Sequence, residues 1–434
     1  MNNEAIINDA VARGFEAVEK PVIAVSGGTG PYGDAAAAAW KQGLQIDERG
    51  QPAPNLANAA LALRQAPELL GAVAYDEMLR HVVVTRVLPE SPIAQVSGSR
   101  ALQDTDEGVI QEWLQRQGLR RLGKNTAQQA ISLVAREHTF HPVKKYLHSL
   151  RWDGVPRISS WLSTYLGADA TQYTAAIGRW FLIAMAARIM TPGCKADYML
   201  VLEGDQGAHK SIVCAILGGT WFSDALPDLH RGDQIRISMH LRGKWIIEIG
   251  ELSSIGKAES GALKAFLTQT EERYTPKFGH NEVIEPRQCV FIGTTNKTAY
   301  LHDETGGRRF WPVKVGVIDT VALATGRDQL FAEAVVAFRA GERWWPDGDF
   351  ERTHIQPEQA ARYEADAWEE LIVPFLAERQ RATVLEVARW GLFIETPRIG
   401  TAEQRRITAI MKRVGWGPGN RGPQGERYLY PLAV

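Results

Sequence analysis

The chain has few cysteines, no long apolar run and almost no net charge. Its 434 residues include only three cysteines, Cys194, Cys214 and Cys289, without paired spacing or an accompanying histidine cluster. A disulfide scaffold or a zinc site is therefore not expected, and a reducing cytoplasm fits this usage. No run of about 18 uncharged apolar residues occurs, so we expect no membrane span, and the N-terminus lacks a basic-then-apolar signal pattern.

The charge balance excludes a protein that binds nucleic acid through a global basic field. The formal net charge is −1, so any such contact must come from a local patch. Apolar residues make up 45% and charged residues 23%, which is typical of a soluble globular protein. The length allows two to four domains.

Changes in the residue pattern along the chain predict four segments. Residues 1–55 are expected to form a linker or a partly ordered segment, and residues 56–190 a helical domain. Residues 191–350 alternate between strand and helix patterns, which predicts an α/β sheet. Residues 367–434 show three helices and a terminal hairpin, the pattern of a small winged-helix-like module.

An apolar strand at 200–203 that runs into a glycine-containing loop is the strongest functional signal. Gly204 and Lys210-Ser211 have the spacing of a phosphate-binding loop, and an apolar helix follows. Backbone N–H groups at a helix N-terminus hold phosphate oxygens, Lys210 would reach the β- and γ-phosphates, and Ser211 would ligate Mg²⁺. His209 stands where this pattern usually has glycine. The alternative is a glycine-rich turn with an exposed lysine. The residues expected to contact the nucleotide are Gly204, Asp205, Gln206, Gly207, Ala208, His209, Lys210, Ser211 and Ile212.

Two further apolar strands end in polar residues that suit phosphoryl transfer. Glu248 lies within the first strand, where an unpaired carboxylate is costly, and Glu251 follows it. One of them would bind Mg²⁺ and the other would orient the attacking water, and the sequence leaves the assignment open. Asn296 ends the second strand, and its amide can contact the γ-phosphate and the water. A solvent-exposed acidic pair and an Asn-capped turn are the alternatives.

Arg308 and Arg309 follow two glycines and precede an aromatic pair. A guanidinium group is suited to neutralising phosphate charge, and a cation that reaches a neighbouring subunit would make hydrolysis depend on an oligomer. The alternative is a pair of surface cations.

A glycine-tipped hairpin between the acids and Asn296 is the candidate DNA contact. Lys277, Phe278 and His280 surround its tip, and Lys264 adds charge upstream. A cation for phosphate and a ring for base stacking suit single-stranded DNA. The alternative is an ordinary surface hairpin.

The C-terminal segment is a second candidate DNA contact, in this case for duplex DNA at an origin. A solvated helix or a protein-docking module is the alternative. The cations of this segment are Arg405, Arg406, Lys412, Arg413, Arg421 and Arg427.

The ordered combination of these motifs resembles the virulence-associated protein E family of phages and mobile genetic elements. The stretches that carry the resemblance are 141–143 with 152–154, 203–211, 245–252, 263–268, 291–296, 300–303 with 306–311, and 329–334 with 341–345.

The resemblance extends to superfamily III helicases and to the helicase halves of poxvirus-type primase-helicases. It implies an AAA+-like ATPase core, ATP and Mg²⁺ as cofactors, a homo-oligomeric ring (a hexamer is expected), and replication of element DNA in the cytoplasm of a bacterial host. About 100 unmatched N-terminal residues are too few for a primase domain, so a primase would be a separate chain. The main hypothesis is an ATP-dependent DNA helicase or translocase. The alternative is an ATP-switched replication initiator or DNA-binding protein with little hydrolysis.

Overall fold

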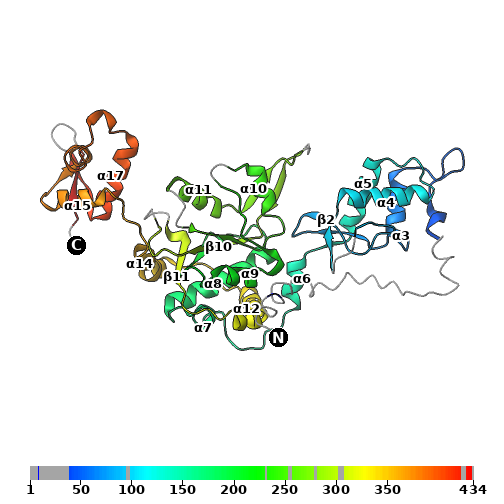
Figure 1. Cartoon of the computed structure of the whole chain (residues 1–434), viewed down its shortest axis with the longest axis horizontal. Helices are drawn as coiled ribbons and strands as arrows, with labels where there is room; N and C mark the ends of the chain where they lie inside the picture. Colours follow the sequence, from blue (N-terminus) through cyan, green and yellow to red (C-terminus); the bar gives the residue numbers. More distant parts are fainter. Residues whose placement is uncertain are drawn as a thin grey trace. The chain divides into compact units, whose positions relative to one another are not determined.

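The computed structural model describes residue 8 and most of the chain from residue 39 onward. The described ranges after residue 8 are 39–93, 98–229, 232–252, 257–277, 281–301, 307–421 and 427–432. The chain divides into two compact units, one of residues 1–298 with 306–359 and the other of residues 299–305 with 360–434 (Figure 1). Within the first unit, the stretch from Trp40 to Ala135 has a hydrophobic core of its own.

This first stretch combines helices with a small sheet that the sequence pattern did not reveal. The sheet has the strand order β3-β2-β1-β4, and α3 and α5 pack together beside β1. The strands are too short for a clear alternating pattern, so the segment was predicted to be helical. Its elements are α3 (Leu56–Gln65), β1 (Val73–Asp76), β2 (His81–Val84), β3 (Arg100–Ala101), α4 (Asp104–Arg116), α5 (Lys124–Glu137), β4 (Thr139–Phe140) and α6 (Pro142–Ser149).

A five-stranded sheet forms the centre of the first unit. Its strand order is β11-β5-β10-β7-β6, and every neighbouring pair is parallel. All five carboxyl ends therefore lie at one edge of the sheet. The strands are β5 (Met199–Glu203), β6 (Phe222–Ser223), β7 (Ile246–Ile249), β10 (Val290–Thr295) and β11 (Phe310–Lys314).

Helices cover both faces of this sheet, as the apolar strands require. Ile292 of β10 belongs to the core shared with α8, α9 and α12, whereas the adjacent Phe291 points to the opposite face and contacts Phe266 of α11 (ring centroids 5.3 Å apart). The helices are α7 (Trp161–Leu166), α8 (Gln172–Met190), α9 (Lys210–Gly218), α10 (Gln234–His240), α11 (Lys257–Leu267), α12 (Thr320–Arg339), α13 (Gly348–Phe350) and α14 (Gln356–Ala360).

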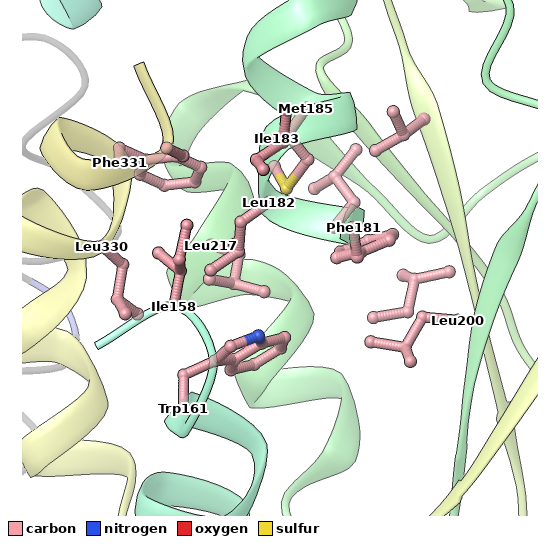
Figure 2. Close-up of a cluster of buried hydrophobic side chains, with 14 of the residues drawn as sticks. Ile158, Trp161, Phe181, Leu182, Ile183, Met185, Leu200, Leu217, Leu330 and Phe331 are labelled. Carbon is pink, nitrogen blue, oxygen red and sulfur yellow. The ribbon is translucent and has the colours of Figure 1, made fainter. Parts of the chain in front are cut away.

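Helix α8 is buried on nearly all sides between the sheet and α12. Figure 2 shows part of this core, in which side chains of α8 lie against Leu217, Leu330 and Phe331. Gly178 allows α7 to approach closely, because a Cβ at this position would lie 2.8 Å from Nε1 of Trp161.

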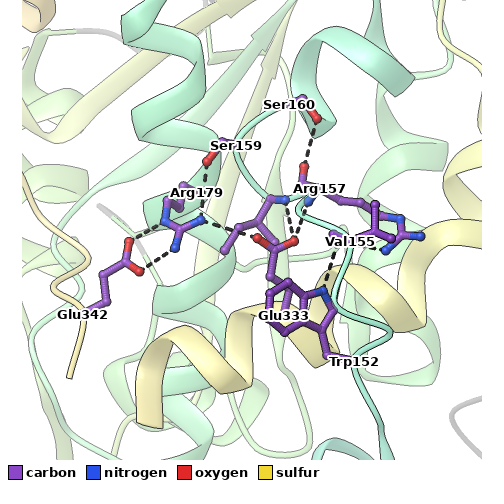
Figure 3. A network of polar contacts seen from close by, with 9 residues as sticks. Trp152, Val155, Arg157, Ser159, Ser160, Arg179, Glu333 and Glu342 are labelled. Carbon is purple, nitrogen blue, oxygen red and sulfur yellow. Dashed lines mark hydrogen bonds and ion pairs between the residues drawn. The ribbon is translucent and has the colours of Figure 1, made fainter. Parts of the chain in front are cut away.

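A buried carboxylate attaches the segment before α7 to this helical layer. Glu333 of α12 accepts the backbone N–H groups of Arg157 (2.5 Å) and Ile158 (3.0 Å) through Oε2. Arg179 of α8 bridges Glu333 and Glu342 (Figure 3). These contacts satisfy backbone donors that α7 cannot satisfy itself, and they fix the helices that support the sheet from one side.

An antiparallel hairpin, β8 (Glu271–Tyr274) and β9 (Val283–Pro286), leaves the sheet between α11 and β10. Buried ion pairs hold its base. Arg287 pairs with Glu272, and Arg242 lies 2.7 Å from Glu285. Ser238 of α10 donates to Glu272 over 2.9 Å, so the base of the hairpin is rigidly attached to the unit.

The second unit has a separate hydrophobic core around Ile372, Ile407 and Leu429. A three-stranded antiparallel sheet of order β12-β14-β13 packs with its helices. Three helical segments are followed by a hairpin, and the winged-helix-like character of the unit stays a prediction. The elements are α15 (Glu369–Ala377), β12 (Ala382–Thr383), α16 (Val384–Glu386), a π-helix (Val387–Gly391), α17 (Thr401–Arg413), β13 (Trp416–Arg421) and β14 (Arg427–Pro431).

Candidate functional site

The loop between β5 and α9 lies at the carboxyl edge of the five-stranded sheet. Gly207 and His209 have positive φ angles of 84° and 61°, and His209 is the residue that precedes the first turn of α9. Loops with left-handed residues aim successive N–H groups into a concavity that suits an anion. Glycine adopts this conformation freely, whereas His209 adopts it at a cost of about 1–2 kcal/mol.

Lys210 folds back onto the carbonyl groups of this loop. Its Nζ donates to the carbonyl oxygens of Gly204 (2.6 Å) and Asp205 (2.8 Å). Burial lowers the pKa of Lys210, while the nearby charges of Asp205 and Glu248 act in the opposite direction. The ammonium group is therefore held at the loop by weak neutral acceptors that a stronger anion can replace.

Glu248 lies next to the first turn of α9 and is only 3% exposed. It shares a sheet face with Ile246, which packs in the core on the α9 side. Ser211 and Thr294 both donate to its Oε1 over 2.7 Å. Its Oε2 is buried and has no hydrogen-bond partner among the described residues. An orphaned carboxylate oxygen beside a serine hydroxyl is a donor set that suits a hydrated Mg²⁺.

Asn296 follows the last residue of β10 and is exposed. The backbone brings it to the loop, because Thr295 pairs with Glu203 and the N–H of Gly204 donates to the Thr295 carbonyl over 3.2 Å. The structure therefore gathers Lys210, Ser211, Glu248 and Asn296 at one edge of the sheet. From the sequence alone, this grouping can be predicted only on the assumption that the strands are parallel.

Glu251 lies just beyond β7 and lines a cavity of about 520 Å³ together with Glu248. Its backbone has a φ of 49°, a left-handed conformation that is uncommon for a non-glycine residue. Asp224 and Glu259 also line this cavity. Sequence reasoning missed both residues, although Asp224 could have been noticed as an acid directly after a strand.

Arg308 and Arg309 lie at the opposite edge of the sheet. They immediately precede Phe310, which pairs with Met199 at the amino end of β5. The five residues of β5 separate the two edges by roughly 16 Å at about 3.3 Å per residue. The Nε of Arg309 is buried without a hydrogen-bond partner among the described residues. The backbone of these arginines therefore lies at the edge away from the loop of their own chain.

The candidate DNA contacts on and near the hairpin have different positions. Lys277 is exposed in the turn that follows β8, whereas Phe278 and His280 lie outside the described residues. Lys264 is only 8% exposed, and its Nζ lies 5.9 Å from the centre of the Phe310 ring. Burial therefore leaves little of this side chain accessible to DNA, and its role as a DNA contact stays a prediction.

A family model for the virulence-associated protein E-like domain matches residues 147–364, half of the chain. The chain belongs to the virulence-associated protein E-like family. The matched range contains the whole five-stranded sheet and the loop after β5. No protein with a curated description matches the chain.

This chain is also similar to solved structures of the NrS-1 C-terminal region. The apo structure of NrS-1 residues 305–718 has 14% identity and a TM-score of 0.41, and it covers 83% of this chain and 96% of that one. An A-form apo structure of the same region has 12% identity and a TM-score of 0.42 with the same coverage. Values this low assign neither an activity nor a ligand to this chain.

Two further observations on this virulence-associated protein E-like chain concern metal ligands and membrane spans. Within the described residues, no group of three or more His, Cys, Asp or Glu side chains could hold a metal ion by itself. No helix in the described part of the chain is long and apolar enough to cross a bilayer.

In the second unit, ion pairs occupy part of the cation set on α17. Arg406 lies 2.5 Å from Asp366, and Arg413 lies 3.3 Å from Glu369. Arg405 and Lys412 are exposed. The expected duplex-binding face of α17 is thus smaller than the sequence indicated.

Proposed function

We propose that this chain is an ATP-dependent DNA helicase or translocase of the superfamily III type, acting in the replication of phage or mobile-element DNA. In this proposal, the five-stranded sheet is the AAA+-like core, the 204–211 segment is its P-loop, and the second unit is a winged-helix-like module. The observation that carries the proposal is the contact between Ser211 and Glu248 at the start of α9, with a buried carboxylate oxygen left over.

ATP binding is assigned to the loop and the first turn of α9. The N–H groups of residues 204–212 and the positive end of the helix dipole hold the phosphates. Lys210 exchanges its two carbonyl partners for β- and γ-phosphate oxygens, which bind an ammonium more strongly because they are charged. Ser211 and Glu248 would hold Mg²⁺, which would supply positive charge against the charge that develops during phosphoryl transfer.

Two residues at the same edge are assigned to the attacking water. Glu251 borders the cavity beside Glu248 and accepts a proton from the water. Asn296 holds the water and the γ-phosphate through its amide, because it follows β10 next to Gly204. The spacing of the two acids suits this division, with the buried one at the metal and the exposed one at the water.

Arg308 and Arg309 are assigned to the nucleotide of an adjoining subunit. They lie at the far edge of their own sheet, so they reach a triphosphate only if subunits associate head to tail. Such heterologous contacts close into a ring, and a hexamer is the expected form. The hairpin with Lys277 then contacts single-stranded DNA that passes through the ring.

The deciding experiment measures ATP hydrolysis with and without single-stranded DNA. Wild-type turnover should rise with DNA, and Lys210→Ala should abolish it. Lys124→Ala, which removes an exposed lysine at the start of α5, is the matched control and should hydrolyse normally. Absence of any calorimetric signal with ATP and Mg²⁺ would remove the proposal.

The ATP-switched initiator remains the second candidate, and one observation favours it. Lys210 is already satisfied by two carbonyl groups of its own loop, so ATP could act mainly by releasing this closure. This candidate predicts tight ATP binding, negligible turnover, and duplex binding that is lost on truncation near residue 367. Steady unwinding of a forked substrate would contradict it.

A further inference from the structure

Two exposed aromatic rings lie in and just after the π-helix Val387–Gly391. Trp390 is 61% exposed and Phe393 is 80% exposed. They lie three residues apart, where the π-helix Val387–Gly391 ends. The N–H of Ile394 donates to the Ala388 carbonyl over 2.9 Å, which holds the turn in place. We refer to residues 389–393 as the aromatic turn.

The backbone of the aromatic turn is strained at one of its two exposed rings. Phe393 has a φ of 55°, which is rare for a bulky residue and unfavourable without compensation. A buried ring would repay such strain by packing, but this ring is largely in solvent. Backbone strain of this kind concentrates at sites that hold ligands.

Cations accompany these rings without acidic partners. The guanidinium of Arg389 lies 5.4 Å from the centre of the Trp390 ring. Arg379 stacks 3.6 Å from the centre of the Phe375 ring, and Phe375 in turn packs beneath Gly391. Among the described residues, neither Arg389 nor Arg379 forms an ion pair. This contrasts with Arg406 and Arg413 of the same unit, which pair with acids.

We propose that the aromatic turn, with Arg389 and Arg379, is a binding site for single-stranded nucleic acid. Unpaired bases stack on exposed rings, and phosphates satisfy guanidinium groups that have no carboxylate partner. An apolar protein partner would bury these cations unpaired, which is costly. Duplex DNA is disfavoured because its bases are already stacked on one another.

The charge of the unit indicates that the rings provide most of the affinity. Residues 299–305 and 360–434 together contain eleven Arg and Lys and eleven Asp and Glu. The unit therefore has no net field to attract phosphate, and the affinity should depend only weakly on salt. This site differs from the α17 face expected for duplex DNA, and it does not require ATP.

The test is fluorescence anisotropy with labelled 20-nucleotide oligothymidylate, oligouridylate and a duplex of the same length. The full-length chain is used without nucleotide and in a background with Lys210→Ala and Lys277→Ala, so the outcome is independent of the ATPase proposal and of the hairpin contact. The double variant Trp390→Ala with Phe393→Ala should weaken single-strand binding by at least about tenfold. Val317→Ala, which removes an isolated side chain that is 92% exposed, should leave the affinity unchanged.

Two further variants separate binding from folding. Phe393→Gly relieves the positive φ, so its midpoint of urea unfolding should stay equal or rise while single-strand affinity falls. Trp390→Tyr keeps a stacking ring and should retain most of the binding. The proposal is overturned if the wild type does not bind single strands, if it binds the duplex equally well, or if the double variant binds like the wild type. The two oligonucleotides distinguish DNA from RNA as the preferred strand.

Discussion

The hydroxyl of Ser211 lies 2.7 Å from Oε1 of Glu248 and joins the first turn of α9 to the centre of the sheet. Thr294 of the next strand donates to the same oxygen over the same distance. Oε1 of Glu248 therefore accepts two hydrogen bonds, whereas its buried Oε2 accepts none from the described residues. A group that binds here can contact Oε2 without first breaking either hydrogen bond to Oε1.

Replacement of each acid by its amide should separate the roles of Glu248 and Glu251. Glu248→Gln keeps an acceptor for Ser211 and removes the charge, so Mg²⁺-dependent ATP binding and hydrolysis should both fall, the latter on the order of 100-fold. Glu251→Gln should lower hydrolysis and leave ATP binding intact. Calorimetry with MgATP and steady-state hydrolysis measure the two effects. The assignment would be reversed if Glu251→Gln alone lost magnesium dependence.

Removal of a buried donor should cost stability independently of activity. Thr294→Val keeps the shape of the side chain and takes one hydrogen bond from a buried carboxylate, so the free energy of unfolding should fall by about 1–3 kcal/mol. Thr325→Val is the control, because its exposed hydroxyl only bonds a carbonyl of its own helix. Urea unfolding of both variants should show a change within about 0.5 kcal/mol for the control.

His209→Gly and His209→Ala should differ in stability because the strain belongs to the backbone. Glycine relieves the left-handed conformation but loses more chain entropy on folding, so we expect it to be more stable than alanine by about 1 kcal/mol. Both variants should bind ATP if the imidazole itself makes no contact with phosphate. Equal unfolding midpoints would show that the loop relaxes without the glycine.

Acidic pH should lower the free energy of unfolding through His141. This residue caps α6 by accepting the N–H of Lys144 at Nδ1 over 3.2 Å. Burial lowers the pKa of His141 to about 4, with Lys144 contributing. Between pH 4 and 6.5 the native chain binds fewer protons here than the unfolded chain. The stabilisation is therefore complete above pH 6.5 and is lost as the pH falls towards 4.

His141→Asn supplies a cap that does not titrate, so its unfolding free energy should fall less than that of the wild type over this pH window. The expected difference is up to about 3 kcal/mol. Asp76 acts in the opposite sense in both chains, because burial raises its pKa to about 6 and its contribution is lost as the pH rises. Comparison of variant with wild type cancels this effect. Parallel pH profiles would contradict the proposed role of His141.

Subunit mixing should reveal whether the arginines act across an interface. Lys210→Ala and the double variant Arg308→Ala with Arg309→Ala should each be inactive alone. After random co-assembly, about a quarter of the interfaces combine an intact loop with intact arginines, so hydrolysis should partly return. Continued inactivity of a mixture that demonstrably co-assembles would mean that the arginines act within their own chain or only in structure.

Much of the site was predictable because it depends on local patterns. The apolar strand, loop and helix from Leu200 to Leu217 can be read from periodicity and glycine spacing, and the structure has the same element order there. The gathering of Glu248 and Asn296 beside this loop follows from parallel strands, whose carboxyl ends share an edge. The chemical roles of these residues remain predictions.

Other features could not be predicted because they depend on packing. The burial of Lys264 follows from the helix face that meets β11, and one sequence does not show which face that is. Arg406 pairs with Asp366, which lies 40 positions away in the sequence. The number of cations on α17 therefore exceeds the number that is free of an acidic partner. The four-stranded sheet before α6 escaped notice because its strands have two to four residues.

Strand β5 has a consequence for the synthesis of the chain. Both of its neighbours, β10 and β11, are encoded later, and the last residue of β11 follows β5 by 111 positions. At ordinary translation rates, β5 waits on the order of ten seconds on the ribosome before it can pair. During that interval its apolar edges are open to other nascent chains, so premature termination before Lys314 should yield insoluble fragments.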